Sequence, residues 1–135
     1  MNDFNAQVIE EFRANDGKVG GNFEGAPLLL LHSTGAKSGE PRLHPVMYQA
    51  NGDRYVIFAS KAGAPDNPAW YHNLVANPQA SIEVGTDTLE VTATEATGAE
   101  RDELFEKQKE IFPTFAEYEA KTSRTIPVVI LTPAG

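Results

Sequence analysis

Short apolar and β-branched runs, separated by turn-forming residues, constrain the fold of this chain most strongly. Five such runs lie between residues 28 and 96, and a sixth follows Pro127. Two of the gaps hold the turn sequences Asn51-Gly52-Asp53 and Gly85-Thr86, which favour β-hairpins. The pattern predicts six short strands, over residues 28–34, 42–49, 54–60, 80–84, 88–96 and 128–132.

Individual strands carry further information. The run from Leu28 to Leu31 is too apolar for a half-exposed strand, so we expect burial on both faces. Residues 88–96 alternate apolar and polar side chains, which is typical of a strand with one buried face. Pro45 has no backbone N–H, so its strand should lie at an edge or contain a bulge there.

Four helices complete the prediction. Residues 3–14 are amphipathic, with Phe4, Val8, Ile9 and Phe12 on one side; we expect this side to pack on the protein body, because an acidic polar face opposes binding to anionic lipid. Proline at the start predicts a short helix over 68–75. The T-x-x-E pattern at 97–100 predicts a capping box and a helix to about residue 111, followed after Pro113 by a helix over 114–121. Antiparallel strands with peripheral helices describe a small α+β barrel.

Length and composition narrow the class of protein. A chain of 135 residues without cysteine is expected to fold as one domain in a reducing, cytoplasmic environment. No apolar run approaches the ~20 residues of a membrane-spanning helix, and the first residues lack the pattern of a signal peptide. The net charge of -8 argues against a nucleic-acid partner. The glycines at 17, 20, 21 and 25 form a loop whose spacing does not fit a dinucleotide site.

One segment departs from the acidic balance. Residues 32–73 contain four of the eleven Lys and Arg residues, all three histidines and the only tryptophan. Their only acids are Glu40, Asp53 and Asp66. Because local potential guides a ligand more than net charge does, this segment suggests an anionic ligand.

The loop from Gly35 to Arg42 is the first candidate site. Backbone N–H groups beside Gly35 and Gly39 could approach an anion, with Lys37 and Arg42 supplying charge. The pattern is not a nucleotide phosphate loop, since no helix follows it. By spacing alone, a hairpin loop with water-exposed polar residues is the better explanation.

Other candidates are also ambiguous by themselves. Ser60 and Lys61 follow a predicted strand and could either contact a ligand or form a turn. The aromatic residues Phe112, Phe115 and Tyr118 recur every three residues and could line a cleft or belong to the core. The histidines lack metal-ligand spacing and no serine lies in G-x-S-x-G, so we expect neither a metal site nor a serine hydrolase.

Taken together, several stretches resemble the deazaflavin-dependent nitroreductase family, whose members use coenzyme F420. The resemblance covers residues 26 to 133, and the order and spacing of its pieces are more specific than any one piece. The matching pieces are Thr34-Gly35-Ala36-Lys37-Ser38-Gly39-Glu40-Pro41-Arg42, Pro45-Val46-Met47, Ala59-Ser60-Lys61, Asn67-Pro68-Ala69-Trp70-Tyr71-His72-Asn73-Leu74, Asn77-Pro78, Phe112-Pro113-Thr114-Phe115-Ala116-Glu117-Tyr118, Thr122 and Arg124-Thr125-Ile126-Pro127-Val128.

The resemblance implies a split β-barrel akin to small flavin-binding barrels. One domain, 1–135, would comprise an N-terminal helix and loop (1–25) and a cofactor-binding barrel (26–133). Lys37 and Arg42 would hold the phosphodiester and oligoglutamate tail of F420. Further cofactor contacts are implied for Ala36, Ser38, Pro45, Val46, Met47, Ala59, Ser60, Lys61, Ala69, Trp70, Asn73 and Phe115.

The implied chemistry is hydride transfer from the reduced deazaflavin to an electron-poor small molecule. Ser60 and Tyr118 would be the catalytic residues, and Phe112, Phe115 and Tyr118 would contact the acceptor. The best-studied nitro-reducing pattern has tyrosines at the positions of Phe112 and Phe115. Their absence puts bicyclic nitro-drug reduction in doubt, and we expect quinones, enones or unsaturated lactones as acceptors.

Two other functions stay open at this stage. The barrel could be an FMN-dependent oxidoreductase, or a non-catalytic module that sequesters the deazaflavin or a lipid. The sequence is also compatible with a monomer or a homodimer, and with peripheral membrane contact through the first helix.

Overall fold

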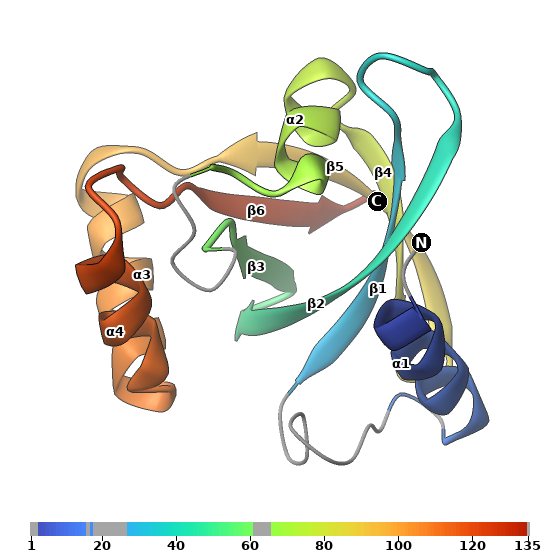
Figure 1. Ribbon diagram of the computed structural model, residues 1–135, viewed down its shortest axis with the longest axis horizontal. Coiled ribbons are helices and arrows are strands. Elements are labelled where there is room, and N and C mark those ends of the chain that lie inside the picture. The colour runs from blue at the N-terminus through green and yellow to red at the C-terminus, as the bar shows by residue number, and fades with distance from the viewer. Residues whose placement is uncertain (1–2, 16, 18–26, 61–65, 135) are drawn as a thin grey trace.

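The computed structural model describes residues 3–15, 17, 27–60 and 66–134. Within these residues, six strands close into one antiparallel barrel in the order β1-β2-β3-β6-β5-β4 (Figure 1). The strands are β1 (Leu28–Thr34), β2 (Pro41–Asn51), β3 (Arg54–Phe58), β4 (Gln79–Val84), β5 (Asp87–Glu95) and β6 (Val128–Pro133). The helices are α1 (Asp3–Ala14), α2 (Ala69–Ala76), α3 (Gly98–Ile111) and α4 (Thr114–Lys121). The predicted α+β split barrel is confirmed, and every predicted strand is present with its ends shifted by at most 2 residues.

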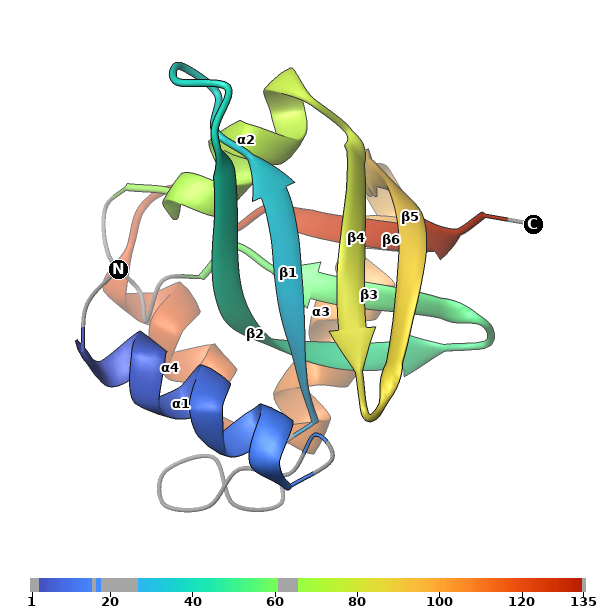
Figure 2. The same ribbon diagram turned by 90° about the vertical axis from the view of Figure 1, so that its right-hand side faces the viewer.

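Two hairpins form where the turn sequences predict them. Gly52 has a φ of +64° between β2 and β3, and Gly85 has a φ of +58° between β4 and β5. A side chain is disfavoured at positive φ, which is why glycine suits both turns. The barrel closes because β6, from the end of the chain, pairs with β3 on one side and β5 on the other (Figure 2).

The long strand β2 pairs differently along its length. Residues 41–47 pair with β1, including Pro45 opposite Leu30, whereas residues 48–51 pair with β3. Pro45 therefore lies where β2 has a strand on one side only, a position that tolerates a missing N–H. The predicted edge position is confirmed.

The strand β1 separates two apolar clusters. Leu29 and Leu31 belong to the cluster inside the barrel, while Leu28 and Leu30 belong to an outer cluster under α1. This double burial explains the unbroken leucine run, since successive strand residues point to opposite faces.

The helix α1 contributes Val8, Ile9 and Phe12 to that outer cluster. Their side chains are 5%, 6% and 1% exposed, and burying each stabilises the fold by roughly 1.5–3 kcal/mol. Packing of α1 on the protein body is therefore confirmed for these three residues; the side chain of Phe4 lies outside the described set.

The remaining helices cover other parts of the barrel. The helix α2 lies across one end, where Trp70 and Leu74 join the interior cluster (Figure 2). The pair α3–α4 covers the outer faces of β3 and β6 through a third cluster (Figure 1). The residues of this cluster are Val56, Phe58, Ala96, Leu104, Phe105, Phe115, Ile126, Val128 and Ile130.

The helix α3 begins where the T-x-x-E pattern predicts, but the predicted capping box is wrong, because its side-chain hydrogen bond to the helix start is not formed. Thr97 is the N-cap residue and has extended backbone angles, but no side chain caps the helix there. The carboxylate of Glu100 instead lies 3.9 Å from the guanidinium of Arg54 on β3. A tertiary ion pair has replaced the local contact that the pattern favours.

Some predictions concern residues outside the described ranges. They are the loop containing Gly20, Gly21 and Gly25, the boundary between residues 25 and 26, and the side chain of Lys61. None of the helices in the described ranges is both long and apolar enough to span a membrane.

Candidate functional site

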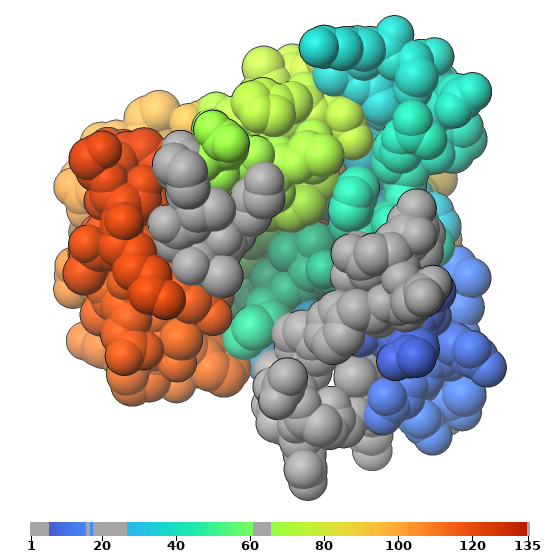
Figure 3. Space-filling view, viewed as in Figure 1, coloured from blue at the N-terminus to red at the C-terminus, as the bar shows by residue number. Residues whose placement is uncertain are grey.

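The surface is hollowed where β2 passes between α2 and the α3–α4 pair (Figure 3). Along β2, Val46 and Tyr48 pack against the interior cluster, so Met47 between them faces outward. Met47 packs against both outer clusters, one under α1 and the other under α3–α4. It thus lies between the two groups of helices and remains half-buried.

The loop between β1 and β2 is folded tightly by its own backbone. The N–H of Gly35 donates to the carbonyl of Glu40 at 2.8 Å, and the N–H of Gly39 donates to the carbonyl of Gly35 at 3.0 Å. A Cβ on Gly35 would lie 2.5 Å from the Ser38 hydroxyl oxygen, so only glycine fits there without displacing Ser38. The conformation of this loop therefore requires glycine at position 35.

The exposed side of this loop carries the predicted cations. Lys37 is exposed and, among the described residues, has no hydrogen bond or ion pair. Arg42 donates to the Ser38 hydroxyl at 3.3 Å and lies 3.5 Å from the carboxylate of Glu40. Since both partners of this ion pair are largely exposed, it holds Arg42 weakly. Both cations are available to an anionic ligand.

Asn73 attaches this loop to α2. Its side-chain carbonyl accepts a hydrogen bond of 2.9 Å from the N–H of Ala36, and its amide donates one of 3.2 Å to the Ser33 hydroxyl. Asn73 is 6% exposed and Ser33 is 5% exposed. Buried polar groups cost free energy unless they are paired, so this bridge fixes the loop relative to the helix.

Ser60 lies at the point where β3 leaves the barrel. The preceding residue, Ala59, is fully buried, and its N–H donates to the carbonyl of Pro127 at 2.9 Å. Ser60 itself is 7% exposed, and its carbonyl accepts a 2.9 Å hydrogen bond from the guanidinium of Arg124. Within the described residues, its hydroxyl has no partner.

The aromatic stripe on α3–α4 has a buried centre and open sides. Phe115 is 6% exposed and packs edge-on against Phe58 at 5.8 Å and against Tyr118 at 5.2 Å between ring centroids. Phe112 and Tyr118 are half-buried against the same cluster. The stripe is thus partly core, as the simpler interpretation held, and partly an apolar surface.

Residues 5–133 match the family model of the F420H2-dependent quinone reductases. The chain belongs to that family. The predicted deazaflavin-dependent family, the oxidoreductase class and the cofactor F420 are thereby confirmed.

Relatives of this family member support the assignment. An F420H2-dependent quinone reductase of Mycobacterium tuberculosis is 43% identical over 125 residues, which are 90% of this chain and 84% of the relative. A solved F420H2-dependent reductase superposes with a TM-score of 0.71 and 42% identity, covering 78% of this chain and 93% of that one. Another solved structure, described as a domain-swapped dimer, superposes with a TM-score of 0.73 and 39% identity over 93% of this chain and 92% of that one.

The residues predicted to contact F420 occupy two kinds of position in this family member. Those with exposed or half-buried side chains outside the interior cluster are Ala36, Lys37, Ser38, Arg42, Pro45, Met47 and Ala69. Val46, Ala59 and Trp70 pack in or against the barrel interior. These three side chains therefore pack in the core behind the predicted site. A direct contact with a ligand would use their backbone atoms or require rearrangement. The individual contacts stay predictions.

Sequence reasoning assigned no role to Arg124, although it lies in a matching stretch. Its importance becomes visible only through its contacts with Ser60 and Asn67, which are distant along the chain. An arginine followed three residues later by proline gives no local signal of such a contact.

In the described part of the chain, no three His, Asp or Glu side chains cluster in a way that could hold a metal ion. His44 on β2 is half-buried and its Nδ1 has no hydrogen-bond partner among the described atoms. Burial, followed by the charge of Arg42, lowers the pKa of His44. His44 therefore favours the neutral form.

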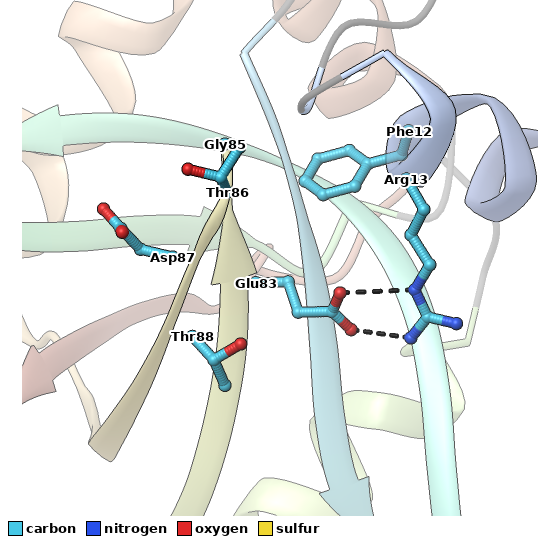
Figure 4. Close-up of a pocket in the computed structure, with 7 residues that line it drawn as sticks. All are labelled: Phe12, Arg13, Glu83, Gly85, Thr86, Asp87 and Thr88. Carbon is cyan, nitrogen blue, oxygen red and sulfur yellow. Dashed lines mark hydrogen bonds and ion pairs between the residues drawn. The ribbon is translucent and has the colours of Figure 1, made fainter.

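A charged pocket of about 240 Å³ lies away from this site, beside the β4–β5 turn (Figure 4). There Arg13 of α1 donates two hydrogen bonds to Glu83 of β4, at 2.7 and 3.2 Å. His32 Nε2 lies 2.5 Å from the same carboxylate. Because Glu83 is shared by two partners, this cluster is best explained as a fastening of α1 to the barrel.

Proposed function

We propose that this protein reduces quinones with reduced F420 as the hydride donor. The observation that carries the proposal is the combination of two features in this family member: an exposed cationic loop that Asn73 ties to α2, and an aromatic wall formed by Phe112, Phe115 and Tyr118 on α3–α4. The loop suits an anionic tail, and the wall suits a flat apolar acceptor.

The loop residues fit the anionic part of the cofactor. Lys37 is exposed and has no partner in the part of the chain that the structure describes, and the ion pair of Arg42 with Glu40 is weak because both groups are exposed. The backbone N–H groups of Gly35 and Gly39 already donate within the loop, so the charged side chains are the groups that would contact the tail. Lys37 and Arg42 would neutralise the tail, while Asn73 would keep the loop in place.

The bound cofactor supplies the hydride chemistry. Conversion of a quinone into a hydroquinone requires one hydride and one proton. Ser60 lies two residues after the end of β3, and its hydroxyl has no partner among the described residues, so it can hydrogen-bond a ligand. Tyr118 is half-buried beside Phe115. Within the described residues the Tyr118 hydroxyl has no partner, so it can hold a carbonyl oxygen of the acceptor or give it a proton.

The apolar wall supports quinones over nitro compounds as acceptors. Phe112 and Phe115 present no hydroxyl groups, and Phe115 packs against Phe58 in the core. Enones and unsaturated lactones share the electron-poor, largely apolar character of quinones and are acceptable alternatives within the same proposal.

We also propose that the protein acts in the cytoplasm, as a monomer or a homodimer. Peripheral membrane contact through α1 receives no support, because its side chains Val8, Ile9 and Phe12 are already buried on the barrel. A membrane-bound α1 would have to use other residues.

The test is a titration of the purified apo-protein with reduced F420, oxidised F420 and FMN at two salt concentrations, followed by turnover with a soluble benzoquinone. We expect micromolar or tighter F420 binding that weakens with salt and that weakens about tenfold in Lys37→Ala and Arg42→Ala. Lys107→Ala removes an exposed lysine from α3 and serves as the matched control.

Each alternative predicts a different result. Preference for FMN would support a flavin-dependent oxidoreductase. Tight F420 binding without oxidation by any quinone, enone or lactone would support a sequestering module. Binding of neither cofactor would refute the proposed function.

A further inference from the structure

Arg124 joins three parts of the chain that border the proposed site. It lies in the connection between α4 and β6, where its backbone N–H donates to the Thr122 hydroxyl at 3.3 Å. Its guanidinium donates through Nη1 to the side-chain carbonyl of Asn67 at 2.6 Å and through Nη2 to the backbone carbonyl of Ser60 at 2.9 Å. These acceptors are 57 and 64 residues away along the chain.

The two acceptors adjoin two different elements. Ser60 follows the end of β3, and Asn67 immediately precedes Pro68, the N-cap residue of α2. One guanidinium therefore links the exit of β3 to the entrance of α2. The helix α2 in turn carries Asn73, which holds the cationic loop.

The connection on the other side of Arg124 leads directly to the aromatic wall. The helix α4 ends at Lys121 and carries Phe115 and Tyr118. Arg124 follows α4 closely in the chain and hydrogen-bonds the Ser60 carbonyl, so it connects the helix that carries the aromatic wall to Ser60.

The hydrogen bond from Arg124 engages the backbone of Ser60 but not its side chain. The Ser60 carbonyl is paired with Arg124, so the buried backbone is satisfied, while the hydroxyl has no partner among the described residues. A fixed backbone with a free hydroxyl is the arrangement expected for a side chain that hydrogen-bonds a ligand.

An arginine is suited to this bridge for a geometric reason. Its planar guanidinium presents several N–H groups in a fixed fork, so two acceptors on different segments can be held at once. A lysine ammonium can keep the charge but cannot reproduce the fork. Arg124 is also partly buried, which strengthens these hydrogen bonds relative to those in water.

We propose that Arg124 is a positioning residue for cofactor binding and hydride transfer, because it sets the place of Ser60 relative to α2 and the aromatic wall. The inference rests on the proposed function. It assigns Arg124 no contact with substrate or cofactor; Arg124 acts through Ser60 and Asn67.

The experiment compares wild type, Arg124→Lys, Arg124→Met and Asn67→Ala by F420H2 titration, by kcat and KM with a soluble benzoquinone, and by thermal unfolding. Hydrogen bonds from a charged group are strong enough that Arg124→Met should raise the Kd for F420H2 about tenfold, with a smaller rise in Arg124→Lys and Asn67→Ala. We expect kcat at saturating cofactor to fall in parallel, with little change in the KM for quinone.

Arg101 supplies the matched control. Its guanidinium also donates to a backbone carbonyl of the same connection, that of Ile126 at 2.8 Å, but it contacts neither Ser60 nor Asn67. Arg101→Met should reduce thermal stability to a similar degree and leave the Kd for F420H2 within about twofold of wild type.

A double-mutant cycle separates positioning from general stability. Ser60→Ala should weaken F420H2 binding in the wild-type background and have little further effect in Arg124→Met, because the hydroxyl is already displaced there. Additive effects of the two substitutions, or an unchanged Kd in Arg124→Met, would overturn the inference while leaving the proposed function intact. Failure of the wild-type protein to bind F420H2 would instead remove the proposed function, and the inference with it.

Discussion

The side-chain carbonyl of Asn73 accepts a hydrogen bond from the backbone N–H of Ala36 at 2.9 Å. This contact joins α2 to the loop that carries Lys37 and Arg42, over a separation of 37 residues in the sequence. The amide of Asn73 continues the link to Ser33 on β1. The position of the cationic loop therefore depends on a residue outside the loop.

We expect Asn73→Ala to weaken F420 binding about tenfold and to lower the free energy of unfolding by about 1–3 kcal/mol, since the N–H of Ala36 loses its partner. Titration with F420 and chemical denaturation measure the two effects. Asn77→Ala, at the exposed end of α2, is the control. Equal F420 affinity in Asn73→Ala and wild type would show that the loop keeps its position without this bridge.

The aromatic wall predicts different effects of a hydroxyl at neighbouring positions. Phe115→Tyr places a polar group at a site that is 6% exposed and should destabilise the protein by about 1–3 kcal/mol. Phe112→Tyr adds the same group to a half-buried side chain and should change stability little. Thermal unfolding and the ratio of nitro to quinone kcat/KM test this prediction; we expect that ratio to rise in Phe112→Tyr. An unchanged ratio would mean that these hydroxyls do not govern acceptor choice.

The ion pair between Arg13 of α1 and Glu83 of β4 predicts that the stability of the protein depends on pH. Arg13, by hydrogen bonding, lowers the pKa of Glu83, so the folded state binds the proton less readily than the unfolded state does. The stabilisation is therefore present above the unfolded pKa of about 4.3 and is lost as the pH falls through the lower folded pKa.

Glu83→Gln should accordingly reduce stability at pH 7 by about 1 kcal/mol and reduce the loss of stability between neutral and acidic pH. Hydrogen exchange of the α1 amides should rise in the same variant. Glu90→Gln removes an exposed carboxylate on β5 and provides the comparison. A pH profile that is identical in Glu83→Gln and wild type would contradict the assigned role.

A buried amide pair predicts non-additive mutations. Gln49 is 3% exposed and donates to the carbonyls of Leu104 at 3.1 Å and of the Gln108 side chain at 3.2 Å. The other polar atoms of the pair, Gln49 Oε1 and Gln108 Nε2, have no partner among the described atoms.

Because removal of one partner leaves a buried polar group unpaired, Gln49→Met and Gln108→Met should each cost about 1–3 kcal/mol, whereas the double variant should cost less than the sum. Chemical denaturation of the four proteins completes the cycle. Additive costs would show that each glutamine acts through packing alone.

Much of the fold could be predicted from local patterns. The glycines at 52 and 85 fixed two hairpins, the alternation in β5 and the leucine run in β1 indicated how each is buried, and Pro45 marked a strand with one free side. These features depend on the backbone geometry of single residues and on side-chain periodicity over short stretches. The ordered set of family motifs added the cofactor, which no local pattern identified.

The tertiary structure decided which residues meet. It placed Trp70 and Ala59 in the barrel interior, turned Glu100 toward Arg54 instead of the helix start, and brought Arg124 to Ser60 and Asn67. Such contacts form between residues that lie far apart along the chain, so they depend on barrel closure and helix packing and not on neighbouring sequence. The sequence by itself therefore determined the strands, the turns and the family of this protein, while only the closed barrel determined how its predicted site is held together.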